Sequence, residues 1–270
     1  MSADRTERPT PGAVITTVDI CASDIFEVLS NTSEEFLRAL ESLRIPRYTE
    51  AMENLESACR ECLGRSRTIT GMGFIGEPEN GFPTELSILW WIREHDEMRR
   101  KKHVLNPASD SYYDYNTSEW FGTPRSTGKP FITAPYVDSW GTDQLTLTAV
   151  IPLNLRGTFI GVIAADLDPA LFLRPIERLL LNTDRLTLVD SENRVILSSI
   201  PVLTSGISAE PYLSQTNGSQ VSRAISHTTN WAAIDLPNEA TKGSDGHFLR
   251  SSGAPPATDP SSSSATGLQG

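Results

Sequence analysis

Residues 113–166 contain the side chains whose chemistry is easiest to interpret. Aromatic residues gather there in a turn-rich segment, together with the carboxylates of Asp138 and Asp166. Aromatic residues in such a segment are on their own more often core than ligand-binding. Asp166, however, ends the apolar run Gly161–Ala165, and a buried carboxylate needs a partner or shifts toward its neutral form. Aromatic walls with two acidic groups are suited to a small cation, through cation–π attraction and charge-assisted hydrogen bonds.

Five short elements of this region follow one another in an order that resembles the ligand-binding half of double Cache domains, the PAS-like sensor modules of bacterial chemoreceptors and sensor kinases. The elements are Tyr113-x4-Ser118-x-Trp120-Phe121, Pro135-Tyr136-Val137-Asp138, Leu145-Thr146-Leu147-Thr148, Ile151-Pro152 and Gly161-Val162-Ile163-Ala164-Ala165-Asp166. In layout the resemblance extends over about residues 24–236. It implies a small-molecule sensor that is a binding module and not an enzyme.

The family's pattern for amino-acid ligands is a Tyr, then Arg-x-Trp-Tyr, then Tyr-x-Asp and a final Asp. In that pattern the Tyr-x-Asp pair and the final Asp bind the ammonium group of the ligand. By resemblance these residues are Tyr136, Asp138 and Asp166. The amine-binding half of the pattern is therefore complete in this chain.

The half of the pattern that binds the ligand's carboxylate is altered. Trp120 is present, but Ser118 stands at the arginine position and Phe121 replaces the second tyrosine. Arg125 could supply a guanidinium, although a solvated loop arginine is the more common case. The resemblance thus favours an amine, such as a polyamine or a decarboxylated amino acid, over an α-amino acid. The expected ligand-binding residues are Tyr113, Ser118, Trp120, Phe121, Tyr136, Asp138 and Asp166.

Two other motifs have weaker support. Gly71-Met72-Gly73-Phe74-Ile75-Gly76 matches the dinucleotide pattern GxGxxG, but a turn follows it where a helix is needed, so we interpret it as a glycine-rich strand. Cys59 and Cys62 match CxxC, but a structural zinc site needs four ligands, and neither Cys21 nor the scattered histidines provide a second pair. We expect no cofactor and no metal.

Two alternatives stay open. One is an enzyme that acts on a small amine with Asp138 or Asp166 as general acid or base. A nucleophile, metal set or cofactor motif beside these residues would favour it, and the sequence shows none. The other is an interaction protein that works through its N-terminal helices and keeps only a vestigial pocket.

The order of the helices and strands expected around the site predicts an α+β fold. It has a PAS-like antiparallel sheet, a long N-terminal helix and a reduced second lobe. Residues 144–153 and 158–167 are the clearest strands, because β-branched and apolar residues run between turn signals. The expected organisation is a flexible N-terminus over 1–23, a helical segment over 24–64, a ligand-binding lobe over 65–182, a reduced second lobe over 183–237 and a disordered tail over 238–270.

Composition limits the partners. The net charge of −11 disfavours nonspecific nucleic-acid binding, and the basic run Arg99–Lys102 is expected in a solvated loop. No apolar run approaches the roughly 20 residues that span a bilayer, and residues 1–10 do not resemble a signal peptide. Together with an odd number of cysteines, three, this predicts a cytoplasmic chain without membrane contact. The alternative is that the sequence is a segment of a longer membrane receptor. In a cytoplasmic chain, signalling would need a regulatory protein partner or a change in oligomer, such as a homodimer formed through the N-terminal helices.

Overall fold

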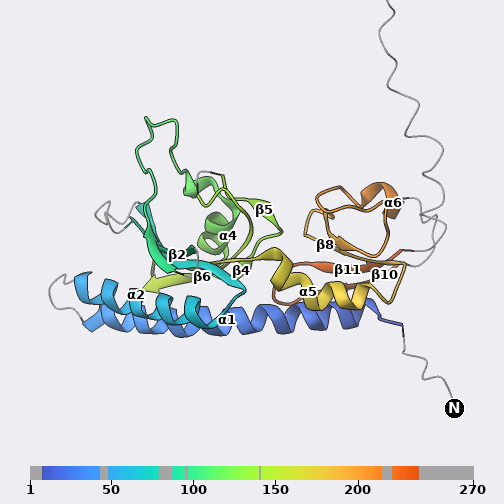
Figure 1. The fold of residues 1–270 in the computed structure, drawn as a ribbon, viewed down its shortest axis with the longest axis horizontal. Coiled ribbons are helices and arrows are strands. Elements are labelled where there is room, and N and C mark those ends of the chain that lie inside the picture. Colours follow the sequence, from blue (N-terminus) through green and yellow to red (C-terminus); the bar gives the residue numbers. More distant parts are fainter. Residues whose placement is uncertain are drawn as a thin grey trace, which may run out of the picture.

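One long helix runs beneath two lobes (Figure 1). The computed structural model describes residues 8–42, 48–78, 87–94, 97–139, 141–214 and 221–236, so the predicted disordered tail over 238–270 lies outside the described residues. The larger lobe is built on a seven-stranded sheet and the smaller lobe on a four-stranded sheet. The predicted α+β class, with an antiparallel sheet and a long N-terminal helix, is confirmed.

Helix α1 spans Pro11–Ser42 and therefore begins well before residue 24, where the sequence analysis placed the first helix. Thr10 lies just before it, and its hydroxyl accepts a hydrogen bond from the backbone N–H of Ala13 at 3.2 Å. Pro11 occupies the first helical position, where its missing N–H costs nothing. The prediction of a flexible segment over 1–23 is wrong from Pro11 onward, because its prolines were taken as signs of disorder and not as a helix start.

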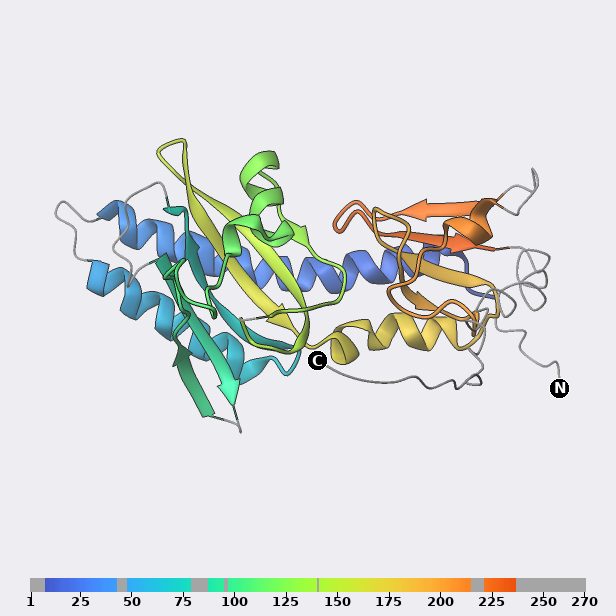
Figure 2. The same cartoon turned by 90° about the horizontal axis from the view of Figure 1, so that it is seen from above.

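Helix α2 spans Tyr48–Arg65 and packs beside α1 under the larger lobe, as the view from above shows (Figure 2). Apolar residues of both helices join the main core under the sheet. Cys59 of the CxxC motif is buried in that core, and burial raises the pKa of its thiol well above the usual range. No described helix is both long enough and apolar enough to cross a membrane.

The larger sheet has the strand order β3-β2-β1-β7-β6-β4, with β5 paired to β6. The two clearest predicted strands are neighbours in it and run antiparallel, as expected. The GxGxxG sequence forms a strand and not a phosphate-binding turn. The strands are β1 (Ile69–Gly76), β2 (Ile88–Glu94), β3 (Glu97–Lys101), β4 (Phe131–Ile132), β5 (Tyr136–Val137), β6 (Leu145–Leu155) and β7 (Thr158–Leu167).

The two faces of the larger sheet pack against different layers. In β7, Ile163 and Ala165 belong to the core over the helices, while Val162 and Ala164 belong to a second core on the opposite face. Successive side chains of a strand point to opposite faces, so Asp166 lies on the same face as Val162 and Ala164. The short 3-10 helix η2 (Tyr115–Thr117) and helix α4 (Glu119–Thr127) cover this face.

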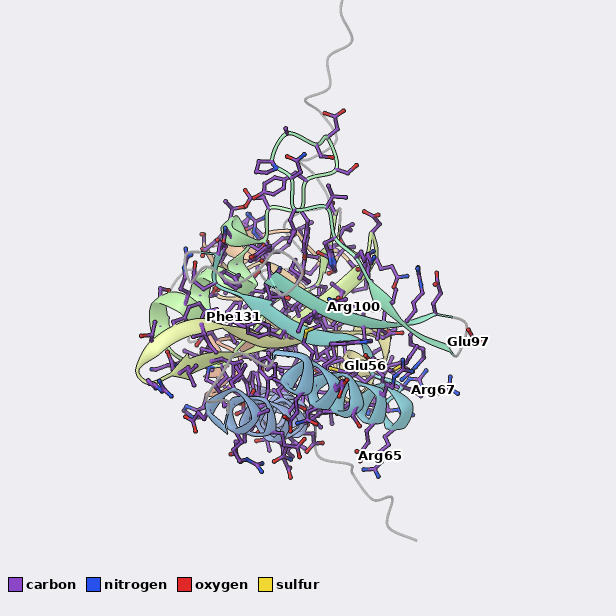
Figure 3. All side chains as sticks on the ribbon, turned by 90° about the vertical axis from the view of Figure 1, so that its left-hand side faces the viewer. Glu56, Arg65, Arg67, Glu97, Arg100 and Phe131 are labelled. Carbon is purple, nitrogen blue, oxygen red and sulfur yellow. The ribbon has the colours of Figure 1, made fainter. Side chains whose placement is uncertain are left out.

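The basic run predicted as a loop lies mainly in an edge strand. Figure 3 looks along the helices, which lie below the sheet, with Arg100 marking β3 at one edge and Phe131 marking β4 at the other. Arg99 pairs with Glu94 of the neighbouring strand. Charged side chains suit an edge strand because they discourage further strand pairing, and the sequence analysis did not consider this role.

The smaller lobe follows helix α5 (Pro169–Leu180). The side chain of Asp168 caps α5 by accepting hydrogen bonds from two backbone N–H groups, and Pro169 is its first residue. The second sheet has the order β10-β11-β8-β9. The elements of the smaller lobe after α5 are β8 (Leu186–Val189), β9 (Val195–Ser198), α6 (Glu210–Ser214), β10 (Ser222–Ile225) and β11 (Ala232–Asp235).

Candidate ligand-binding site

A small cavity of about 20 Å³ lies between the larger sheet and the layer formed by η2 and α4. This is room for about one water molecule, so a larger ligand would have to move the walls apart. Five of the predicted ligand-binding residues line the cavity, namely Tyr113, Trp120, Tyr136, Asp138 and Asp166. The remaining lining residues are Ile75, Ile88, Trp90, His103, Thr148 and Ala164.

Asp166 lies in the floor of the cavity near the end of β7, in register with Gly71 of β1 and Thr148 of β6. The Thr148 hydroxyl donates a hydrogen bond to its carboxylate at 2.8 Å. Burial raises the pKa of Asp166 to about 7, and the negative charge of Asp138 contributes in the same direction. At neutral pH this carboxyl is therefore divided between its protonated and ionised forms, and a bound cation would favour the ionised form.

Asp138 follows β5 and is also buried, but it is better supplied with donors than Asp166. The hydroxyl of Tyr113 donates to it at 3.0 Å. Thr142 donates twice, from its backbone N–H at 2.6 Å and from its hydroxyl at 3.1 Å. These hydrogen bonds replace the water that an ionised carboxylate loses on burial.

Gly141 leaves the space that the Asp138 carboxylate occupies. A Cβ at this position would lie 1.9 Å from one carboxylate oxygen of Asp138 and 2.4 Å from its Cγ. We expect Gly141→Ala to push the carboxylate away from its donors and to weaken amine binding about three- to tenfold, the effect of one lost hydrogen bond. Calorimetric titration measures this. Gly122→Ala is the matched control, because a Cβ there meets nothing within 4 Å; equal losses in the two variants would contradict the prediction.

The two tyrosines connect the carboxylates to the aromatic walls. Tyr136 and Thr148 share a hydrogen bond of 2.8 Å between their hydroxyls, so Tyr136, Thr148 and Asp166 form a chain. Burial and the nearby carboxylates raise the pKa of both Tyr113 and Tyr136 above the usual range. Both phenols thus stay protonated and serve as neutral donors beside the two acidic groups.

The charges in the cavity are unbalanced. Asp138 and Asp166 both line it, and none of the described lining residues is a lysine or arginine. Two neighbouring carboxylates in a buried site repel each other and are costly to keep ionised. A small cation removes that cost, and Trp120, Tyr113 and Tyr136 offer ring surfaces around it. The arrangement is therefore chemically suited to an ammonium group.

Of the three residues at the carboxylate-binding positions, Trp120 lines the cavity, but Ser118 and Phe121 do not. Ser118 lines a separate outer cleft, and Phe121 is fully buried in the core beneath α4, where its ring contacts Tyr115 and Trp120. Arg125 belongs to α4 and not to a loop. Its guanidinium pairs with the buried Glu77 at 3.4 Å and lies 5.7 Å from the centre of the Phe121 ring.

Of the lining residues that were not predicted, three carry polar side-chain atoms: Trp90 of β2, His103 and Thr148. Thr148 stood in one of the quoted strand elements, and alternation from Asp166 across the β6–β7 pair could have placed it on the same face. Trp90 and His103 lie much earlier in the chain than the strands β6 and β7. Trp90 reaches the cavity because β2 pairs with β1 and β1 pairs with β7, and His103 follows β3, which pairs with β2.

An outer cleft of about 360 Å³ lies next to the cavity, between the two lobes. Trp120 and Tyr136 line both spaces, so these two rings form the wall between them. The far side of the cleft is formed by the β8–β9 turn, with Asp190, Glu192 and Arg194. The cleft therefore connects the cavity wall to the smaller lobe.

Comparison with known proteins gives one family match and several structural relatives. Residues 55–171 match the family model described as the first PDC sensor domain of methyl-accepting chemotaxis protein-like proteins. In sequence, the methyl-accepting chemotaxis protein TlpQ of Pseudomonas aeruginosa is 30% identical over 87 residues. That match covers 30% of this chain and 12% of TlpQ.

Solved structures resemble this chain over most of its length. The ligand-binding domain of the P. aeruginosa amino acid chemoreceptor PctB, in complex with L-arginine, has a TM-score of 0.55 and 16% identity, covering 84% of this chain and 85% of that one. The ligand-binding domain of the Campylobacter jejuni chemoreceptor Tlp3, in complex with L-valine, has a TM-score of 0.54 and 13% identity, covering 84% and 90%. At sequence identities this low, the structural similarity establishes the fold alone.

Proposed function

We propose that this chain senses a small molecule and that the molecule is an amine, a proposal supported by the match of residues 55–171 to the family model of a PDC sensor domain. One observation carries the proposal. Asp138 and Asp166 are both buried in one aromatic-lined cavity, and no lysine or arginine is present among its described lining residues. An ammonium group would supply the missing charge.

An amine is preferred over an α-amino acid because the ligand's carboxylate would have no cationic partner. Ser118 lines the outer cleft, and the Arg125 guanidinium is already paired with Glu77. A carboxylate in the cavity would instead lie near Asp138, a group of like charge. Unpaired burial of a charged group is costly. In this respect we expect the chain to differ from PctB and Tlp3, whose solved domains contain amino acids.

The test is calorimetric titration of ligand pairs that differ only by the carboxylate. Agmatine is compared with L-arginine, and isobutylamine with L-valine. We expect each amine that binds to do so at least about tenfold more tightly than its amino acid, since a charged group loses hydrogen bonds worth roughly 1.5–3 kcal/mol each. Equal affinity within the pairs would contradict the amine preference, and no binding of any amine or amino acid would contradict ligand sensing here.

The Ser118→Arg variant provides the matched reversal. It restores the arginine of the family pattern beside Trp120, and we expect it to shift the preference toward the amino acids. An unchanged preference in this variant would mean that position 118 does not contribute to ligand selection.

The output of the sensor belongs to the same proposal. Helix α1 contacts strands of both sheets, and Asp19 accepts hydrogen bonds from Ser226 and Thr228 of the smaller lobe. We propose that a ligand-dependent change reaches a regulatory partner, or a second copy of the chain, through α1 and α2. Cross-linking with and without agmatine would test this. The cytoplasmic location stays a prediction, tested by fractionation of cells that carry the native gene.

A further inference from the structure

The indole N–H of Trp90 is a buried donor without an acceptor. Trp90 is 5% exposed and lines the cavity, and its Nε1 has no hydrogen-bond partner among the described residues. Most buried polar side-chain atoms in folded proteins are paired, because an unpaired donor loses its hydrogen bonds to water. An unpaired donor in a candidate binding cavity therefore points to a ligand group that accepts its hydrogen bond.

The backbone leaves room for this indole beside Asp166. Trp90 is in register with Gly73 of β1, and Gly71 is in register with Asp166 of β7. The ring lies against Gly71, where a Cβ would come within 2.9 Å of the indole nitrogen. The absence of a side chain at Gly71 thus allows the indole to cross the sheet face toward the strand that carries Asp166.

His103 adds a second unpaired polar atom to the same cavity. It is a lining residue, and its Nδ1 has no hydrogen-bond partner in the part of the chain that the structure describes. Its ring stacks on Tyr113 with 4.9 Å between ring centres. Burial and the charge of Lys101 lower the pKa of His103 to about 4, so the imidazole is neutral at physiological pH and adds no cation to the cavity.

We propose that Trp90 and His103 form a polar subsite for a second group on the ligand, a neutral hydrogen-bond acceptor such as a hydroxyl or an amide oxygen. The inference rests on the proposed amine function and narrows the ligand to amines that carry such a group. The acceptor is neutral because a carboxylate would meet the charges of Asp138 and Asp166, which line the same cavity. Trp90 donates to the acceptor, and His103 donates or accepts according to its tautomer.

The experiment uses pairs of amines of nearly equal size, one with a hydroxyl and one with a methyl group. Ethanolamine is compared with propylamine, and 3-amino-1-propanol with butylamine, by calorimetric titration of the full chain. We expect the amino alcohols to bind about three- to tenfold more tightly, the effect of one hydrogen bond to a buried donor. In Trp90→Phe, which removes the N–H and keeps an aromatic ring, this preference disappears.

Trp91→Phe is the matched control. Trp91 is the next residue of β2 and is fully buried, but it belongs to the core on the helix side of the sheet. This variant keeps the preference for the amino alcohols. If both variants lost the preference to the same extent, the effect would come from general repacking, and the subsite would be wrong.

The outcomes separate this inference from the amine proposal. If the amines bind but hydroxyl and methyl partners bind equally well, the subsite is overturned and the amine proposal stands. If no amine binds, both fall. A second measurement follows the indole N–H resonances of the five tryptophans: one resonance, absent in Trp90→Phe, shifts more with ethanolamine than with propylamine. Equal shifts would mean that the indole meets only water.

Discussion

Replacement of Asp166 by asparagine is expected to weaken amine binding about ten- to a hundredfold, because the variant removes one of two buried charges that face the ammonium group. Asparagine has nearly the same shape, and its side-chain oxygen can still accept the hydrogen bond that Thr148 donates to Asp166. The loss therefore reports on charge and not on packing. Calorimetric titration with agmatine at pH 8, where wild-type Asp166 is mostly ionised, gives the comparison.

Two controls accompany this variant. Asp168→Asn removes an equal charge two residues away, and asparagine is also a good N-cap for α5, so agmatine affinity stays near that of wild type. At pH 5.5 the wild-type carboxyl is largely protonated, because its pKa is about 7. The difference in agmatine affinity between wild type and Asp166→Asn is therefore smaller at this pH. A difference that does not change with pH would show that Asp166 acts through shape alone.

The same substitution is expected to stabilise the unliganded protein at high pH. The pKa of Asp166 is raised to about 7 from an ordinary value of 3.8, mainly by burial. Between these two values the unfolded chain binds fewer protons than the folded chain, so the free energy of unfolding falls as the pH rises. Between pH 5 and pH 8 the loss is about 3 kcal/mol at most, at roughly 1.4 kcal/mol per pH unit up to 7.

Urea denaturation of wild type and Asp166→Asn at pH 5 and pH 8 measures this effect. Other titrating groups are shared by the two proteins, so the difference between their unfolding free energies isolates Asp166. We expect the difference to shift by about 2–3 kcal/mol in favour of the variant over this range. Saturating agmatine reduces the shift, because the ion pair favours the ionised wild type. Parallel pH profiles would mean that Asp166 is not the buried, raised-pKa group described above.

Local patterns in the sequence were enough to predict one side of the cavity. Runs of β-branched and apolar residues between turn signals predicted β7 and its antiparallel neighbour β6, and both strands are present and paired. Tyr136 and Asp138 line the same cavity, as the family resemblance implied. Strand pairs that are close in the chain depend on local turns, so they are accessible to this kind of reasoning.

The opposite side depends on contacts that no local pattern contains. Trp90 and His103 reach the cavity through the pairing of β1 with β7, about ninety residues apart in the chain. Phe121 and Ser118 were assigned to the site by their positions in the family pattern. In the fold, Phe121 of α4 is buried in the core, and Ser118, just before α4, lines the outer cleft. Arg125 pairs with Glu77, and no rule based on sequence spacing predicts this ion pair.

The wall shared by the cavity and the outer cleft has a consequence for the speed of sensing. Trp120 and Tyr136 form that wall, and the space behind them holds little more than a water molecule. A ligand that enters from the cleft must wait until the rings separate, and it leaves only when they separate again. Such gating slows association and dissociation alike and leaves affinity unchanged if both are slowed equally. We therefore expect the lifetime of a bound ligand to depend on how tightly these two aromatic rings pack.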